Sequence, residues 1–181
     1  MPDNNSNVFS INGLKRWLEV VLSLFYAEVC QFCGQERAQS ADGFVGAQCR
    51  KDMRFITPPL CGCCGLPFAG DLTTPFDCAN CRAGEFAFSY ARSAVAAQGV
   101  ALEAIHKFKY AQALWVEPFL AQLLVNAAAP VLDSQSWDMI VPVPLHPAKR
   151  AERGFNQAER LARHLANATH LPLAPKALRR V

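Results

Sequence analysis

The sequence predicts an α/β protein behind a small cysteine-rich region, and three observations lead to this fold class. All eight cysteines lie before residue 82 of the 181-residue chain. Beyond residue 85, apolar side chains recur first with a period of two and then with a helical period. A short apolar run follows at 138–143. With 51% apolar residues, this length suits one ordinary domain and an appendage. We therefore divide the chain into 1–29, 30–84 and 85–181.

The first 29 residues predict an amphipathic helix over 11–28, because apolar side chains recur at steps of three and four. These are Leu14, Trp17, Leu18, Val21, Leu22 and Phe25. Glu19 and Glu28 bracket an apolar run too short for a bilayer span, and no small-residue cleavage site follows it. We expect no membrane span and a cytoplasmic protein. The net charge of +3 is too small to indicate a nucleic-acid or membrane-surface protein by itself.

The cysteines predict metal binding rather than disulfides, since clustered thiols in a reducing compartment more often hold a metal ion. Three C-x-x-C pairs are present: Cys30/Cys33, Cys61/Cys64 and Cys78/Cys81. The second and third pairs are separated by 13 residues, which is zinc-ribbon spacing. Two such turns bring four thiolates to one ion and leave no open position for water or substrate. We therefore predict a structural zinc site at Cys61, Cys64, Cys78 and Cys81.

A first metal site is less complete in the sequence. Its candidate ligands are Cys30, Cys33 and Cys49. Gly46 stands where a matching C-x-x-C pair would begin. Two interpretations remain open: a three-cysteine site completed by Cys63 or Asp52, and a degenerate finger without metal.

The second region begins with alternating Phe86, Phe88 and Tyr90, which predict a strand over 86–98. Helices are predicted over 100–110 and 114–128. The first of them has Leu102, Ile105 and Phe108 on one face, and the second has Trp115, Phe119, Leu123 and Leu124 on one face. Pro130 should mark the end of the second helix. The apolar run at 138–143 reads as a buried strand that ends near Pro142.

A basic loop and a capped helix follow this strand. The loop contains Lys149, Arg150 and Arg153, and Asn156 with Glu159 forms the capping pattern of a helix over 156–168. In an open α/β sheet, ligands bind at the carboxyl ends of strands, where helix amides and basic side chains favour an anion. The alternative is a solvated basic loop before an ordinary capped helix.

The candidate phosphate-binding residues lie in this loop, at the helix start and on the first predicted helix. They are Lys109, Arg150, Arg153, Gly154, Asn156 and Gln157. Gly154 can adopt a backbone conformation that other residues avoid, and the two amide side chains can bind a sugar or base. We assign no catalytic residue, because His146 lacks an acid or nucleophile partner in the sequence.

Three strings behind the cysteine pairs carry a resemblance to a known family. They are Phe108-Lys109-Tyr110, Val141-Pro142-Val143-Pro144-Leu145 and Arg153-Gly154-Phe155-Asn156-Gln157-Ala158. With the cysteines in front, the chain from Cys30 onward resembles the ComF family. These are bacterial competence-associated proteins with a zinc ribbon ahead of a phosphoribosyltransferase-like domain.

The resemblance implies the first part of a type I phosphoribosyltransferase-like parallel sheet with flanking helices. It also implies binding of phosphoribosyl diphosphate or a related phosphorylated ligand, and a role in DNA uptake during natural transformation. By position, Lys109 matches the family lysine near pyrophosphate, and Arg150, Arg153, Asn156 and Gln157 match its second signature. The partners implied are a phosphorylated small molecule, single-stranded DNA and a DNA-translocating helicase.

The sequence departs from the family at two points. Gly46 replaces a family cysteine, and no paired acidic residues followed by a Thr/Gly-rich phosphate loop occur. That loop lies downstream of 177–181 in the family, so we expect a truncated domain that is inactive alone. Phosphoribosyl diphosphate with magnesium is expected only for a complete domain. The alternatives are a non-enzymatic zinc-ribbon module that binds single-stranded DNA or a translocation partner, and a nonfunctional fragment.

Overall fold

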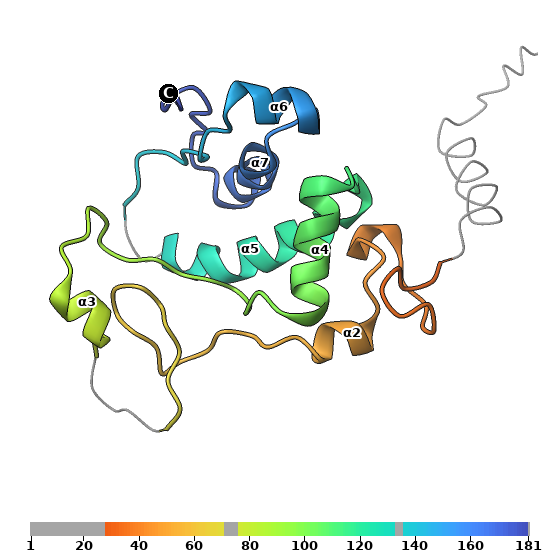
Figure 1. Cartoon of the computed structure of the whole chain (residues 1–181), viewed down its shortest axis with the longest axis horizontal. Coiled ribbons are helices and arrows are strands. Elements are labelled where there is room, and N and C mark those ends of the chain that lie inside the picture. Colours follow the sequence, from red (N-terminus) through yellow and green to blue (C-terminus); the bar gives the residue numbers. More distant parts are fainter. Residues whose placement is uncertain (1–27, 71–75, 133–135, 181) are drawn as a thin grey trace, which may run out of the picture.

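The computed structural model describes residues 28–70, 76–132 and 136–180, and the regular secondary structure of this part of the chain is helical (Figure 1). Its elements in chain order are η1 (Ser40–Asp42), α2 (Ala47–Lys51), α3 (Ala79–Ala83), α4 (Gly99–Tyr110), η2 (Leu114–Val116), α5 (Glu117–Leu132), α6 (Pro147–Arg153) and α7 (Gln157–Thr169). The amphipathic helix predicted over 11–28 lies, except for its last residue, outside the described residues.

The predicted parallel sheet is wrong for the described residues, which contain isolated β-bridges but no β-strand. In the run at 138–143, Ile140 forms one parallel bridge with Leu173. Its amide donates to Pro172 at 2.8 Å, and its carbonyl accepts from Ala174 at 2.9 Å. Pro142 and Pro144 carry no amide hydrogen with which to extend the ladder. The apolar run therefore pairs at a single residue.

The strand predicted from Phe86 is also absent. Phe86 and Phe88 are both exposed, and their ring centres lie 5.1 Å apart. Alternate residues of a strand would place both rings on one face of a sheet, but here they contact each other beside solvent. Further along, Val95 forms an antiparallel bridge with Phe55. The alternation of aromatic residues thus indicated a local ring contact rather than a sheet.

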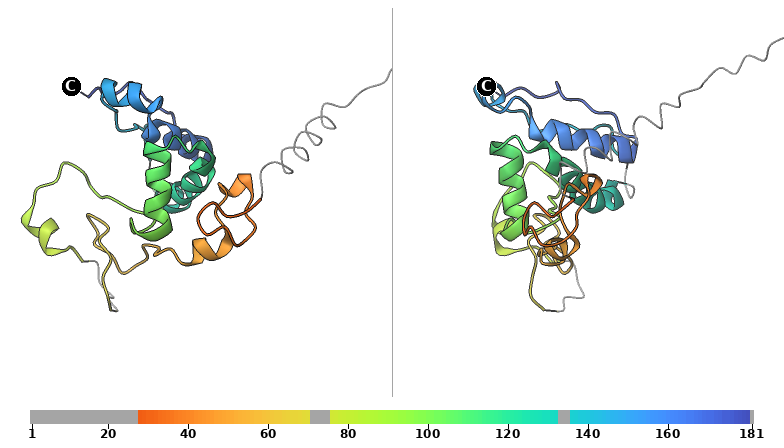
Figure 2. Two further views of the ribbon diagram at one scale, coloured as in Figure 1. Left: turned by 45° about the vertical axis from the view of Figure 1, so that its right-hand side comes forward. Right: turned by 90° about the vertical axis from the view of Figure 1, so that its right-hand side faces the viewer.

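The core lies between α4 and α5, and α7 covers the other side of α5 (Figures 1 and 2). On α4, the buried residues are Ala101, Ala104 and Phe108, at helical spacing. Of the apolar residues that the sequence groups on one face, Phe108 is buried, whereas Leu102 is 37% exposed. The small alanines allow α4 to approach its neighbours closely, and Phe108 fills the remaining space.

Helix α5 continues through Pro130 to Leu132, four residues beyond the predicted end at residue 128. Together with η2, the segment Leu114–Leu132 is long and apolar enough to cross a membrane by length and composition. In the structure, α5 packs against α7 and η1, and its residues Phe119 and Leu120 are buried. Within this segment, 28% of the most apolar 18-residue window is buried.

The turn between α6 and α7 is set by two residues. Gly154 ends α6 with φ +77°, a conformation that costs other residues more. Asn156 begins α7, where its side chain accepts a hydrogen bond from the Ala158 amide at 3.0 Å. The amide nitrogen of the same side chain donates to the Val143 carbonyl at 3.1 Å. The predicted cap is confirmed, and it also fastens the segment before α6 to α7.

The two cysteine-bearing parts of the chain occupy different places (Figure 1). Cys30 and Cys49 belong to the same hydrophobic core as α4 and α5. Cys61 and Cys78 are buried outside that core, in the loops that end with α3. The predicted division at residue 84 stays a prediction.

Candidate metal centre

The structure brings Cys61, Cys64, Cys78 and Cys81 together, and we call these four residues the second cluster. Their sulfur atoms all lie within 4.8 Å of one another, and those of Cys64 and Cys78 are 3.7 Å apart. Four thiolates at the usual zinc–sulfur distance of about 2.3 Å around a tetrahedral ion are separated by about 3.8 Å. The donor set and its spacing therefore fit zinc.

Local backbone geometry positions each half of the second cluster. A bridge between Leu60 and Pro67 closes the turn that carries the first cysteine pair. Gly65 follows this pair with φ +71°, and its amide donates to the Cys61 carbonyl at 3.0 Å. The second pair lies at the start of α3, where Cys78 is the N-cap residue and Cys81 lies in the first turn.

Backbone amides favour thiolate formation in this cluster. Burial of Cys61 opposes ionisation, but the amides of Cys78, Cys64 and Cys63 outweigh it and lower the pKa to about 6. One of these contacts is the Cys78 amide, which donates to the Cys61 sulfur at 3.3 Å. At Cys81, burial and the neighbouring sulfurs raise the pKa. Several thiolates in one small volume repel each other unless a cation lies between them.

The first cluster consists of Cys30, Cys33, Glu36 and Cys49, whose ligand atoms also lie within 4.8 Å of one another. The sulfurs of Cys30 and Cys49 are 3.6 Å apart. The Cys33 sulfur lies 3.9 Å from Oε1 of Glu36. Three sulfurs and a carboxylate form a donor set that zinc accepts.

The thiols of the first cluster differ in pKa. Burial of Cys30 opposes ionisation, yet the amides of Cys33, Gly46 and Phe32 and the Cys49 thiol lower its pKa to about 7. Burial raises the pKa of Cys49 to about 12, with further contributions from the neighbouring sulfurs. The carboxyl pKa of Glu36 is lowered mainly by the Gln48 amide, followed by the Cys49 amide.

Sequence reasoning missed Glu36 and proposed Cys63 or Asp52 in its place. The Cys63 amide instead donates to the Asp77 carboxylate at 3.2 Å, beside the second cluster. Asp52 accepts a hydrogen bond from the Gln48 side chain at 2.8 Å. The only sequence signal for Glu36 was an acidic residue three positions after Cys33, which is common without a metal.

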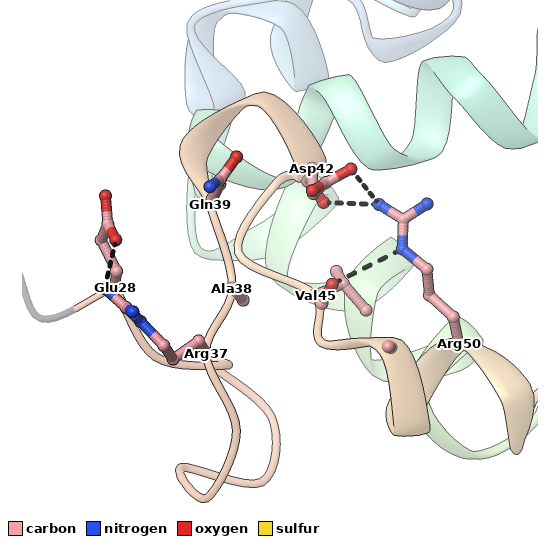
Figure 3. A pocket seen from close by; sticks show the side chains of 8 residues that line it. Glu28, Arg37, Ala38, Gln39, Asp42, Val45 and Arg50 are labelled. Carbon is pink, nitrogen blue, oxygen red and sulfur yellow. Dashed lines mark hydrogen bonds and ion pairs between the residues drawn. The ribbon is translucent and has the colours of Figure 1, made fainter.

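A hollow of about 570 Å³ lies beside the first cysteine turn (Figure 3). Its lining residues are Glu28, Arg37, Ala38, Gln39, Asp42, Val45, Ala47 and Arg50. Arg50 donates to the Asp42 carboxylate at 3.0 Å, and Arg37 pairs with Glu28 at 3.3 Å. Both arginines are thus engaged with acidic groups, which leaves little positive potential for an anionic ligand.

The residues predicted to bind phosphate are partly engaged with neighbours. Lys149 pairs with Glu152 at 2.7 Å, and Arg150 lies 3.8 Å from Glu159. Asn156 serves as the helix cap described above. Lys109 is half-buried, and in the described residues it has neither an ion pair nor a hydrogen bond through its side chain.

Arg153 likewise forms no ion pair among the described residues, although its charge helps to lower the pKa of Glu152. Its guanidinium lies 4.9 Å from the centre of the Tyr110 ring, and Nη1 donates to the Gln157 side-chain oxygen at 3.2 Å. Nε of Arg153 and Nε2 of Gln157 are buried without a hydrogen-bond partner in the described part. Two neighbouring side chains therefore retain unsatisfied donors.

The two sequence motifs that carry these residues pack against each other. Phe108 and Phe155 contact with ring centres 5.3 Å apart, and Tyr110 contacts Arg153. The structure thus brings the end of α4 to the turn between α6 and α7.

Comparison with known families identifies the cysteine-rich region. Residues 21–83 match the family model of the double zinc ribbon domain. Both clusters lie inside the matched range. No curated protein and no solved structure matches the chain significantly. The predicted zinc-ribbon region is therefore confirmed, and it has the double form of the domain.

Proposed function

We propose that this chain is a zinc-organised binding protein whose helical part recognises a phosphorylated ligand. Two zinc ions would hold the ribbon region, one in each cluster. The recognition site would lie where the end of α4 meets the turn between α6 and α7. The single observation that carries the ligand site is the Arg153 guanidinium, which lies over the Tyr110 ring and donates to Gln157 without forming an ion pair among the described residues.

The role of zinc in this proposal is structural. In the second cluster, a closed shell of four thiolates leaves no position for a substrate. The metal would instead hold together loops that have few backbone hydrogen bonds between them. Zinc binding in such regions contributes directly to folding free energy.

A phosphate group suits the site for a chemical reason. A planar guanidinium binds a phosphate through paired, charge-assisted hydrogen bonds, which are among the stronger ones in proteins. The guanidinium of Arg153 is fixed over Tyr110, so little side-chain freedom is lost on binding. Lys109 precedes Tyr110 in the sequence, whereas Arg150 on α6 lies 3.8 Å from Glu159, so its charge is partly balanced.

The resemblance to the ComF family names the ligand and the process in this proposal. The ligand would be phosphoribosyl diphosphate or a related compound, and the process would be DNA uptake in natural transformation. We propose binding and not phosphoribosyl transfer, because the chain contains no acidic pair with a Thr/Gly-rich phosphate loop.

A second candidate is the binding of single-stranded DNA in a complex with a translocating helicase. The exposed rings of Phe86 and Phe88, close behind α3, favour it. Aromatic rings exposed beside a basic surface provide stacking platforms for bases. Arg92, which lies over the Tyr90 ring at 4.9 Å, and Arg82 of α3 are candidate cations for a phosphate backbone.

Calorimetric titration of the zinc-loaded chain tests the ligand site. A phosphorylated ligand, tested first as inorganic phosphate, should bind, and Arg153→Ala should weaken binding by about 1–3 kcal/mol. Arg163→Ala is the matched control, since Arg163 on α7 pairs with Glu159 and lies outside the proposed site. Equal affinity in all three proteins would remove Arg153 from the site.

Separate titrations distinguish the two candidate ligands. Inorganic phosphate should compete with phosphoribosyl diphosphate if the phosphate group carries recognition. Binding of an unstructured DNA strand that weakens steeply with salt and is lost in Phe86→Ala/Phe88→Ala would favour the second candidate.

A further inference from the structure

We propose that Glu36 supplies the fourth ligand of the first zinc site, in place of a cysteine, and that this site exchanges its metal more readily than the second. The inference deepens the proposed zinc binding and rests on it. It concerns the identity of one donor group.

The two ribbons share a backbone plan, which allows their ligands to be matched. In each, a bridge closes the first turn, between Val29 and Arg37 and between Leu60 and Pro67. A glycine with φ near +70° follows each first cysteine pair: Gly34 at +67° and Gly65 at +71°. The amide of each glycine donates to the carbonyl of the first cysteine, at 2.9 Å and 3.0 Å.

The second halves of the ribbons match residue for residue. Cys78 is the N-cap of α3, with φ −67° and ψ 161°. Gly46 is the N-cap of α2, with φ −70° and ψ 163°. Three residues later, Cys81 and Cys49 lie in the first turns of these helices. Gly46 therefore occupies the position of a ligand but has no side chain.

The Glu36 carboxylate fills the space that a side chain at Gly46 would need. A Cβ atom built on Gly46 would lie 2.1 Å from both Cδ and Oε1 of Glu36. The first turn is one residue longer than the second: its bridge spans from residue 29 to 37, against 60 to 67 in the other ribbon. This longer turn carries Glu36 to the place of the missing thiolate.

The carboxylate is held firmly in this place. Oε1 accepts a hydrogen bond from the Cys49 amide at 3.1 Å, and Oε2 accepts one from the Gln48 amide at 2.9 Å. Each carboxylate oxygen has two lone pairs, so these bonds leave one on Oε1 for a metal ion. The alternative is that the Glu36 carboxylate only accepts hydrogen bonds from the amides at the start of α2. It does not explain why Oε1 lies within 4.8 Å of three sulfurs.

Because their donor atoms differ, the two sites should release zinc to a chelator at different rates. Thiolate is the softer ligand and suits zinc well, whereas carboxylate also serves magnesium, calcium and manganese. Cys33 is exposed, whereas both other cysteines of the first cluster are buried. A chelator should therefore reach and empty the first site before the second.

Cobalt substitution of the full chain tests the ligand set, because the visible bands of bound cobalt report the number of thiolates. Cys78→Ser removes the second site, so the remaining spectrum should show three thiolates. Glu36→Ala should weaken cobalt and zinc binding at the first site by about tenfold or more. Asp52→Ala, which removes a nearby carboxylate outside the cluster, should leave metal binding unchanged.

A rescue variant protects the test against simple misfolding. Glu36→Ala/Gly46→Cys should restore metal binding with a four-thiolate spectrum, because the Gly46 backbone conformation suits any residue. A four-thiolate spectrum in Cys78→Ser, or unchanged affinity and spectrum in Glu36→Ala, would overturn the role of Glu36. Failure of the unaltered chain to bind any cobalt or zinc would instead overturn the proposed zinc binding itself.

Discussion

Glu117 on α5 accepts a hydrogen bond from His164 on α7, with 2.9 Å between Oε1 and Nε2. The other carboxylate oxygen pairs with Arg160 of α7. The Glu117 side chain is only 10% exposed, whereas both of its partners reach solvent. One buried acid therefore joins the two helices through two contacts.

Glu117→Ala should lower the free energy of unfolding by about 1–3 kcal/mol, because it leaves two donors with no acceptor at the helix contact. Partial exposure of Arg160 and His164 keeps the value below that of a fully buried pair. Glu103→Ala is the control, since Glu103 forms an exposed pair with Lys107 on one helix. It should cost about 0.5 kcal/mol or less. Denaturant titration measures both, and equal effects would contradict the role of Glu117.

Phe108→Ala should cost about 3–5 kcal/mol, the range for removing a buried aromatic ring. Phe108 is 2% exposed and contacts Phe155, so its loss opens a cavity between α4 and the turn before α7. Leu102→Ala on the same helix removes an exposed side chain and should cost less than about 1 kcal/mol. Thermal unfolding of both variants compares them. A loss of stability in Phe108→Ala no larger than that in Leu102→Ala would show that the contact between Phe108 and Phe155 is not part of the core.

Arg153→Lys should recover only part of the ligand affinity that Arg153→Ala loses. An ammonium keeps the charge but cannot reproduce the planar guanidinium that lies over Tyr110 and bonds Gln157. Titration calorimetry with phosphoribosyl diphosphate measures the difference. Full recovery would mean that charge alone, without the fixed geometry, carries recognition.

The two zinc sites should stabilise different parts of the chain, so the loss of one should not have the same effect as the loss of the other. Cys78→Ser should expose the amides of 60–70 and 76–83 to hydrogen exchange and leave α5 and α7 protected, because the second cluster lies outside the main core. Cys49→Ser should lower protection in α4 and α5 as well, since Cys49 packs in their core. Identical exchange patterns in the two variants would contradict this division.

Local patterns predicted the parts of the structure that depend on few residues. The spacing of Cys61, Cys64, Cys78 and Cys81 predicted their convergence, because two C-x-x-C turns allow few other arrangements. Asn156 was recognised as a helix cap because the capping pattern with Glu159 spans only four residues. These features are fixed within a few residues along the chain.

The remaining errors arose where distant residues decide the outcome. A strand at 138–143 requires neighbouring strands, and the described residues offer only the bridge at Ile140. Besides Phe108, the core face of α4 consists of Ala101 and Ala104, whose small side chains gave a weaker pattern than Leu102. Glu36 was missed because its relation to Gly46 appears only when the first ribbon is folded.

Metal content of the purified chain tests the central claim most directly. After zinc-replete purification and removal of free metal, elemental analysis with native mass spectrometry should find two zinc ions per chain. A brief chelator treatment should then leave one, held by the second cluster. Fewer than about one zinc per chain in the replete protein would contradict the claim that zinc organises the region containing both clusters.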